Sequence, residues 1–453
     1  MTDGTGVLPR SGPTGDQVKR QVRGWNTYWW ASHTFETSVT TVFMSRYLPA
    51  IAKKSVGTNG RIHLLGIPIA PGSLFAYVLT TCAILLVFTM PIVGALADRT
   101  GRKRAMLHSF GAIAALSCIA MVAVGSTDWI LATVLLIIAY LSYTYAKIVC
   151  NSLLPDLAAP EQRDRVSSVG WAYGYIGGGI VLAASFVASF FITDSATLAR
   201  VGLCAAGCWW AAFMVLSYRW LAHLPDSATS RARIAGTAVT AGFRQLAATL
   251  RELRTYPMTL LFLLAYLVYY DGINTVVTLS ADYGQNALKL SDNTLLTAIL
   301  IVQFAAFGGA LLLYRIAVRF GAKRVIAVSL LVWIFIVVAA YFLQAGSAVQ
   351  FFALAMLLSI VMGGTQALSR SLFAQMIPHG REGAYFGFYE ISSSGTSAIG
   401  PLIYGVALQT THSYRIAIFS LVIFFVLGLA ILIPVNVRKA IVAAGNTPPA
   451  TLL

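Results

Sequence analysis

The sequence predicts an all-helical membrane protein with twelve transmembrane helices in two related halves. Its 453 residues are 58% hydrophobic and 11% charged, whereas soluble domains average about 45–50% apolar and about 25% charged residues. The apolar residues form runs close to the ~20 residues that a helix needs to cross a bilayer. Two stretches of sequence also recur at a separation of about 220 residues, as internal repeats of transporters do.

Twelve apolar runs are separated by proline, glycine and clusters of charge. The predicted spans are 24–50, 72–97, 104–125, 129–152, 166–192, 200–221, 257–281, 293–317, 323–344, 348–373, 383–409 and 414–435. These runs are too long for barrel strands and lack their alternation, and a backbone exposed to lipid must satisfy its hydrogen bonds internally. Each run is therefore expected to be a helix.

The repeat divides the chain into halves. "NSLLPDLAAPEQRDRVSSVGWAYGY" from Asn151 parallels "RSLFAQMIPHGREGAYFGFYEI" from Arg370, and "DRTGRKR" from Asp98 parallels "VRFGAKR" from Val318. A duplication of six helices follows. The predicted regions are an amino-terminal tail 1–23, a first half 24–221, a linker 222–256, a second half 257–435 and a carboxy-terminal tail 436–453.

The net charge of +16 is spread over short stretches between apolar runs, which excludes a basic nucleic-acid-binding domain. Basic residues near helix ends are retained in the cytoplasm. With the amino terminus inside, 24 of the 32 Lys and Arg residues lie on the cytoplasmic side and seven lie outside. We therefore expect a multi-pass protein of the cell inner membrane (plasma membrane), with both termini cytoplasmic.

Two polar regions depart from this simple pattern. The first outer loop carries Arg46, Lys53, Lys54 and Arg61; they either attract an anionic solute or belong to a solvated loop. The linker 222–256 has arginines on some helical faces and apolar side chains on another, so we expect it to lie along the anionic inner leaflet. The apolar face consists of Phe243, Leu246, Leu250 and Leu253.

A motif begins at the end of the second predicted span. Its residues are Gly94, Leu96, Ala97, Asp98, Arg99, Gly101, Arg102, Lys103 and Arg104. Gly101 permits a sharp turn, the basic residues hold the loop at the inner surface, and Asp98 ends a span where a helix amino terminus could meet it. The motif resembles the cytoplasmic loop between helices two and three of the major facilitator superfamily.

That resemblance implies the major facilitator fold. It also implies a charge relay of Asp98, Arg102 and Asp156 that latches the outward-facing state. A basic loop that only directs topology is the alternative. In the second half Val318 takes the place of Asp98, so a second latch is not expected.

A narrower resemblance rests on "NSLLPDLAAPEQRDRVSSVGWAYGYIGG", "YYDGINTV" and "SRSLFAQMIPHGREGAYFGFYEISSSG". These segments are similar to the bacterial branch of the vacuole effluxer family, which is related to the fungal autophagy permease that exports amino acids. The family's first helix carries Tyr-Asp-Trp-Ala-Asn-Ser, whereas this chain reads Tyr-Trp-Trp-Ala-Ser-His from Tyr28. The usual acid is missing there, and Glu36 follows two turns later.

Ionisable residues are confined to some of the spans. Helices three, six, nine and twelve lack them over most of their length, as lipid-facing helices should. A charge at mid-membrane costs at least ~2.5–3.5 kcal/mol, so each should face a cavity or a partner. The predicted substrate and proton pathway consists of His33, Glu36, Lys147, Asp271, Asn274 and Glu390. Interhelical hydrogen bonding is the alternative role for these residues.

Proton coupling is assigned to two of these acids, Glu36 and Asp271. Helices one and seven correspond under the repeat, so we expect the two carboxylates to approach across the interface between the halves. A purely structural pairing with Lys147 is the alternative.

The predicted function is alternating access of a small polar solute, of which an amino acid is one candidate, coupled to protons. An enzyme is excluded because the sequence has no nucleotide loop, no metal cluster and no nucleophile with a base at usable spacing. We expect a monomer without cofactor or metal. A lipid or amphiphile translocator and a non-transporting sensor are the alternatives, although tails of about 23 and 18 residues leave little room for a signalling domain.

Overall fold

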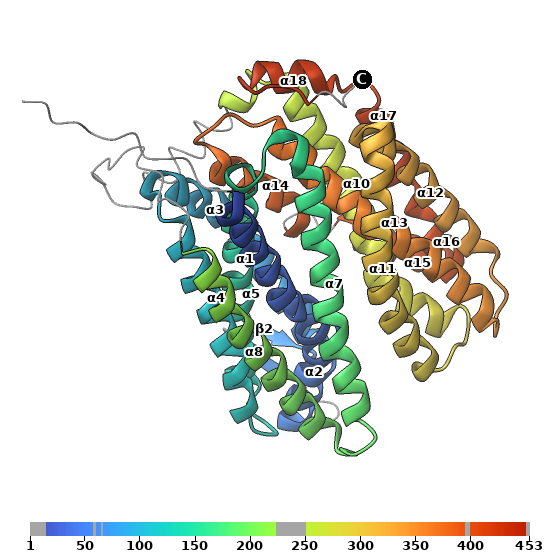
Figure 1. Cartoon of the computed structure of the whole chain (residues 1–453). Helices are drawn as coiled ribbons and strands as arrows, with labels where there is room; N and C mark the ends of the chain where they lie inside the picture. Colours follow the sequence, from blue (N-terminus) through green and yellow to red (C-terminus); the bar gives the residue numbers. More distant parts are fainter. Residues whose placement is uncertain (1–14, 58–59, 65–66, 223–250, 395–398, 450–453) are drawn as a thin grey trace, which may run out of the picture.

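Two helical bundles make up the molecule (Figure 1). The structure, a computed structural model, describes residues 15–57, 60–64, 67–222, 251–394 and 399–449. The first half, blue to green, and the second half, yellow to red, meet at the upper end of Figure 1 and splay apart toward the lower end. We call the upper end, which carries the Asp98–Arg104 loop, the motif end, and the opposite end the pocket end.

The first half contains the elements α1 (Gly15–Thr34), η1 (Phe35–Met44), α2 (Ser45–Val56), β1 (Ile62–Leu64), β2 (Ile67–Ile69), η2 (Pro71–Ser73), α3 (Leu74–Thr100), α4 (Lys103–Ala120), η3 (Met121–Ala123), α5 (Trp129–Ser152), α6 (Leu154–Leu157), η4 (Pro160–Gln162), α7 (Arg163–Ala188) and α8 (Ser195–Trp220). The two short strands, antiparallel with Ile62 opposite Ile69, join α2 to η2 and were not predicted.

The second half contains α10 (Pro257–Asn286), α11 (Asp292–Phe320), α12 (Ala322–Phe342), α13 (Ala348–Gln375), α14 (Glu382–Ser394), α15 (Ile399–Thr411), α16 (Tyr414–Ser420), α17 (Val422–Leu432) and α18 (Val437–Ala443). Most of the predicted linker lies outside the described residues, and so does most of the apolar face expected on it. Leu253, a residue of this face that is described, is buried.

Ten helices are long and apolar enough to cross a membrane within the described part of the chain. The first and eleventh predicted spans do not meet this criterion. Residues 15–56 combine polar stretches with a π-helical segment, and the eleventh span is described as α14 and α15, with 395–398 outside the described residues. The predicted count of twelve is thus confirmed for ten spans.

Helix one is continuous but changes its winding in the middle. The segment η1, of 10 residues, is a π-helix between two α-helices. The hydroxyl groups of Thr40 and Thr41 donate to the Glu36 carbonyl at 2.9 and 2.7 Å. Mid-helix π segments are rare, and those that occur are often found at functional sites. This one places Glu36 on its first turn.

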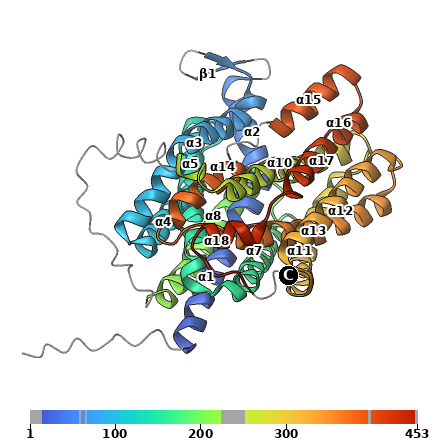
Figure 2. The ribbon, with the colours of Figure 1, turned by 90° about the horizontal axis from the view of Figure 1, so that it is seen from above.

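Predicted lipid-facing helices carry exposed apolar side chains. Leu116 on α4, Val215 on α8 and Phe335 on α12 are examples. In Figure 2, viewed from the motif end, α4 and α12 lie at opposite edges of the molecule. Because the interior is filled by packed helices, these edges are the surfaces left to meet lipid.

The carboxy-terminal residues are not simply a tail. Helix α18 crosses the motif end (Figure 2) and buries Val437 and Ile441. Asn446 Nδ2 then donates to the carbonyls of Gln375 and Ile377 at 2.9 and 2.8 Å. These contacts fasten the end of the chain to the end of α13.

Candidate functional site

Lys147 on α5 joins two carboxylates that come from different halves. Its ammonium lies 3.4 Å from Glu36 Oε1 and 3.3 Å from Glu390 Oε2. Glu36 also accepts a hydrogen bond of 2.6 Å from the Tyr143 hydroxyl. The side chains of Lys147 and Glu390 are 7% and 1% exposed, whereas that of Glu36 is 37% exposed. Glu36 is therefore where this group of charges is most accessible.

A buried amide extends these contacts to an arginine. Asn151 Nδ2 donates to Glu390 Oε1 at 2.7 Å, and Arg370 Nη1 donates to Asn151 Oδ1 at 3.1 Å. We call Glu36, Lys147, Glu390, Asn151 and Arg370 the central ionic network. Two acidic and two basic side chains alternate along it, so each buried charge has an opposite charge or a hydrogen-bonding group beside it.

The network crosses repeatedly between the halves. Glu36, Lys147 and Asn151 lie in the first half, whereas Glu390 and Arg370 lie in the second. Both the Lys147–Glu390 ion pair and the two hydrogen bonds of Asn151 therefore join the halves. The halves cannot separate here without breaking these contacts.

Arg370 is held in an aromatic box. Its Nε donates to Ser167 Oγ at 2.9 Å and its Nη2 to the Ser167 carbonyl at 2.8 Å. The guanidinium carbon also lies 4.9, 4.5 and 5.5 Å from the ring centroids of Trp25, Trp29 and Trp171. A guanidinium can donate in its plane while it stacks on aromatic faces. These contacts explain how an arginine only 2% exposed is accommodated.

Arg370 is absent from the predicted pathway. It lies near the end of the tenth predicted span, where a basic residue is readily explained by topology. The internal repeat could have drawn attention to Arg370, because it aligns this residue with Asn151. These two equivalent positions, 219 residues apart, are hydrogen-bonded to each other in the structure.

His33 lies beside the network on helix one. Its ring packs edge-on against Trp171 and Tyr175, and its Nε2 is 3.9 Å from Glu36 Oε2. The side chain is buried, and its Nδ1 has no hydrogen-bond partner in the described part of the chain. The structure thus brings four predicted residues together: His33, Glu36, Lys147 and Glu390.

Asp271 lies apart from this group. It is 1% exposed on α10 and accepts a hydrogen bond of 2.9 Å from the Gly400 backbone N–H, while its Oδ1 has no hydrogen-bond partner among the described residues. No ion pair joins it to Glu36 or Lys147 in the described ranges. Asn274 is half-buried one turn further along α10. The expected approach of Asp271 to Glu36 is not seen.

At the motif end, Asp98 of the predicted motif caps a helix of the other half. Its carboxylate accepts hydrogen bonds from the backbone N–H groups of Gly383 and Ala384 at 2.8 and 2.9 Å. An anion is favoured at a helix amino terminus. Gly94 and Gly383 lie so close that a Cβ on either residue would overlap the backbone of the other. Glycine is therefore required for this approach of α3 to α14.

Lys103, and not Arg102, is the cation among these acids. Its ammonium lies 3.7 Å from Asp98, 3.1 Å from Asp156 and 3.3 Å from Glu382. Arg102 is exposed and forms no ion pair within the described residues. The relay expected from Asp98, Arg102 and Asp156 is therefore corrected to a cluster of Asp98, Lys103, Asp156 and Glu382, which we call the motif cluster. Lys103 is the first residue of α4 and is buried, whereas Arg102 precedes the helix.

The other motif residues have different roles. Gly101 has φ 63°, a left-handed conformation that favours glycine, and ends α3. Arg104 Nη1 donates to the Ala222 carbonyl at 3.0 Å, and its guanidinium lies 4.2 Å from the Tyr218 ring. Arg99 is exposed. The expected sharp turn is present, and Arg104 ties the loop to the end of α8.

A second set of contacts joins the halves between α7 and α13. Arg163 Nη1 donates to the Ala374 carbonyl at 3.0 Å, and Ser167 Oγ donates to the Ala367 carbonyl at 2.7 Å. Ser371 Oγ donates to Asp164 Oδ1 at 2.5 Å. Together with the motif cluster, these contacts close the molecule at the motif end.

This arrangement can exchange charges and hydrogen bonds, but it offers little for a metal. No group of three or more His, Cys, Asp or Glu residues could hold an ion in the part of the chain that the structure describes. The chemistry available is ion pairing and proton binding at carboxylates.

Comparison with known protein families finds one whose model matches nearly the whole chain. The family model described as "Vacuole effluxer Atg22 like" matches residues 17–445. The chain is 29% identical over 421 residues to the uncharacterised MFS-type transporter YxiO of Bacillus subtilis (strain 168), covering 91% of this chain and 94% of the relative. It is 23% identical over 472 residues to autophagy-related protein 22 of Kluyveromyces lactis, covering 94% and 95%.

Solved structures share the fold at low sequence identity. The proton:xylose symporter XylE, of the major facilitator superfamily, superposes with a TM-score of 0.69 at 12% identity, covering 92% of this chain and 95% of that one. A bacterial homologue of the iron transporter ferroportin, in an outward-facing state, superposes with a TM-score of 0.66 at 15% identity, covering 92% and 98%. These likenesses establish the fold.

Proposed function

The chain belongs to the vacuole effluxer Atg22-like family of major facilitator transporters, and from this premise we propose that it moves a small polar solute by alternating access. The solute binds at the central ionic network, and protons couple its movement through buried carboxylates. An amino acid is the proposed solute, in line with the similarity to autophagy-related protein 22.

The crossing of the central ionic network between the halves is the observation that carries this proposal. Opening the motif end must separate Lys147 from Glu390, whose ammonium and carboxylate are 3.3 Å apart. An uncompensated charge inside a membrane is costly. A bound solute whose own charges replace the lost partners would lower this cost. Such replacement links solute binding to the movement of the halves.

An amino-acid zwitterion fits the accessible part of the network. Its ammonium can pair with Glu36, whose side chain is 37% exposed, and its carboxylate can pair with Lys147 next to it. Tyr143, hydrogen-bonded to Glu36, adds a donor at the same place. A solute with one charge would satisfy only one of these two groups.

The proposed orientation places both termini and the motif end in the cytoplasm, because most Lys and Arg residues then lie inside. The motif cluster and the α7–α13 contacts would close the cytoplasmic side, and the halves splay apart at the other end (Figure 1). The structure then corresponds to an outward-facing state. The proposed location is the cell inner membrane, and a monomer is sufficient for the mechanism.

Substitution of Asp271 tests the proposed proton coupling. Because Asp271 lies apart from the central ionic network, Asp271→Asn should leave that network intact. We expect the variant to fold and bind solute, to lose accumulation against a gradient, and to retain exchange in proteoliposomes. Glu36→Gln should also lose accumulation, but with weaker binding because Glu36 pairs with Lys147. An Asp271→Asn variant that still concentrates solute in response to a pH gradient excludes Asp271 as a coupling residue.

The solute itself is found by a thermal-stability screen of the purified protein against metabolites, because a ligand stabilises the folded state by mass action. Hits are then assayed for exchange in liposomes beside fluorescently labelled lipids. Movement of labelled lipid without movement of any water-soluble hit would favour the lipid or amphiphile translocator over the proposed function.

A further inference from the structure

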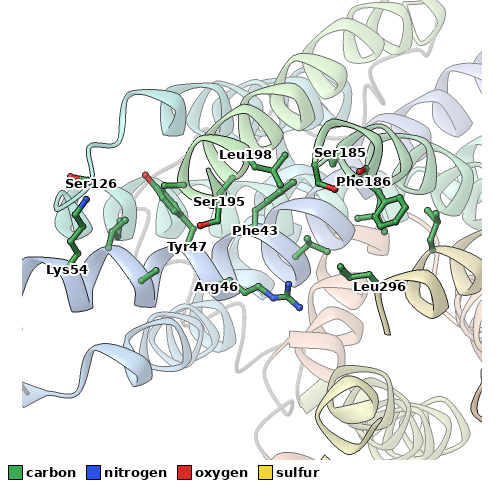
Figure 3. Close-up of a pocket in the computed structure, with 18 of the residues that line it drawn as sticks. Phe43, Arg46, Tyr47, Lys54, Ser126, Ser185, Phe186, Ser195, Leu198 and Leu296 are labelled. Carbon is green, nitrogen blue, oxygen red and sulfur yellow. Dashed lines mark hydrogen bonds between the residues drawn. The ribbon is translucent and has the colours of Figure 1, made fainter. Parts of the chain in front are cut away.

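A pocket of about 360 Å³ lies at the pocket end, between helix one and α11 (Figure 3). Its wall in the first half comes from η1, α2, α7 and α8, and its wall in the second half is the start of α11. Most of its lining is apolar, with Phe43, Leu182, Phe186, Leu198 and Leu300 as the larger side chains. We call it the α2–α11 pocket.

The α2–α11 pocket is separate from the proposed solute site. None of its lining residues comes from α5, α10, α13 or α14, the helices that hold Lys147, Asp271, Arg370 and Glu390. Helix one is shared between the two sites, but Phe43 lies about two turns beyond Glu36. A ligand of this pocket would therefore be a second ligand of the protein.

Two cations line this apolar pocket. Arg46 and Lys54 lie on α2, both exposed, and neither forms an ion pair within the described ranges. In Figure 3, Lys54 lies with Ser126 at one end of the pocket, whereas Arg46 lies nearer Leu296. No Asp or Glu belongs to the lining. The pocket thus combines an apolar interior with two cations that form no ion pair among the described residues.

This positive charge is not explained by topology. Basic residues are enriched on the cytoplasmic side, and Arg46 and Lys54 lie at the opposite end from the motif loop. The turn that follows α7 carries Phe190 and Phe191, which are 70% and 82% exposed. Large apolar side chains exposed together mark a surface that meets a membrane or another apolar partner. The pocket therefore lies beside a surface suited to an amphiphile.

We propose that the α2–α11 pocket binds a free, single-chain anionic amphiphile, such as a medium-chain carboxylate. The anionic group pairs with Arg46, the chain packs among Phe43, Leu182 and Phe186, and Lys54 at the other end of the pocket adds a longer-range attraction. The volume lies at the lower end of the roughly 300–1,000 Å³ of small-molecule pockets, which favours one short chain over a two-chain phospholipid. Because α11 belongs to the second half, the bound ligand favours the arrangement of halves seen here.

The experiment measures binding of radiolabelled decanoate to the full chain in nanodiscs of neutral phosphatidylcholine. Saturable binding is expected, with competition by unlabelled decanoate but neither by acetate, which lacks the chain, nor by decyltrimethylammonium, which carries the opposite charge. Arg46→Gln should weaken binding about three- to tenfold, and Lys54→Gln should weaken it by less. Lys53→Gln is the matched control, because Lys53 is also exposed on α2 but does not line the pocket; its affinity should stay within about twofold.

A neutral substitution tests the location of the chain. Ala50 is exposed and lines the pocket, so Ala50→Phe should block binding without a change of charge. Unchanged binding in this variant would overturn the proposal. An equal loss in Lys53→Gln and Arg46→Gln would also overturn it, because general surface potential would then explain the binding. Phosphatidylglycerol that co-purifies with the parent, resists decanoate and is lost in Arg46→Gln would show that a phospholipid occupies the pocket instead.

Discussion

Lys147 is the residue on which the central ionic network depends, because it contacts a carboxylate from each half. The Glu390 partner is almost fully buried, whereas Glu36 is partly exposed. Removing one member of a buried pair leaves an uncompensated charge and typically costs about 3–5 kcal/mol, while replacing both members by apolar residues is often nearly neutral. The pair is therefore better explained by a functional role than by stability.

A stability comparison follows from this difference. Glu390→Gln should lower the free energy of unfolding by about 3 kcal/mol, because Lys147 then keeps only the partly exposed Glu36 as an anionic partner. The double variant Lys147→Met/Glu390→Met should recover most of that loss but not transport. Thermal unfolding in detergent measures both, with the exposed Glu161→Gln as the control. A double variant less stable than Glu390→Gln would contradict this account.

At the scale of the elements, the contact of α3 and α4 with α14 controls the motif end. Asp98 accepts both N–H bonds at the start of α14, and Lys103 lies among three acids. The helix boundary decides which basic residue takes this place, since Lys103 begins α4 and Arg102 remains outside it. Without the Lys103 cation, Asp98 and Glu382 would repel each other across the interface of the halves.

The motif cluster can be tested with neighbouring residues. Lys103→Gln and Asp98→Asn should weaken closure of the motif end, whereas the exposed Arg102→Gln should not. A loss of ~1.4 kcal/mol would change the ratio of closed to open molecules tenfold. Spin labels at the exposed positions Gln162 and Arg319, one in each half, report the separation. Identical distance distributions in Lys103→Gln and the parent would show that the cluster does not hold the end closed.

At the scale of the whole molecule, two bundles of helices are joined toward one end and splay apart toward the other (Figure 1). The joining contacts are mostly polar and directional: the motif cluster, the α7–α13 hydrogen bonds and the central ionic network. Polar contacts of this kind can be exchanged for contacts with water or solute as the bundles rock. An interface made only of apolar side chains would have no polar groups that could form such replacement contacts in the open state.

The orientation of the molecule is tested by thiol labelling. In a background without the five native cysteines, a membrane-impermeant maleimide added to intact cells should label Ser126→Cys, which lies at the pocket end. It should not label Glu161→Cys at the motif end until the membrane is permeabilised, although Glu161 is also exposed. The reverse pattern would place the termini and the motif end outside the cell.

The hydropathy runs by themselves predicted the helical class and the positions of the spans, since ten of them recur as helices with ends near the predicted ones. Hydropathy is a property of each segment alone, because every transmembrane helix satisfies its own backbone. The loop motif likewise predicted the turn at Gly101 and a helix amino terminus beside Asp98. The repeat predicted the two halves without showing how they contact each other.

Tertiary structure decided which charges meet. The rotation and tilt of each helix depend on its neighbours, and a difference of one position along a helix turns a side chain by about 100°. Sequence therefore could not distinguish Lys103 from Arg102, place Arg370 against Asn151, or separate Asp271 from Glu36. The α2–α11 pocket depends on two halves far apart in the chain. Its basic residues were visible in the sequence, but the apolar walls beside them exist only once the helices pack.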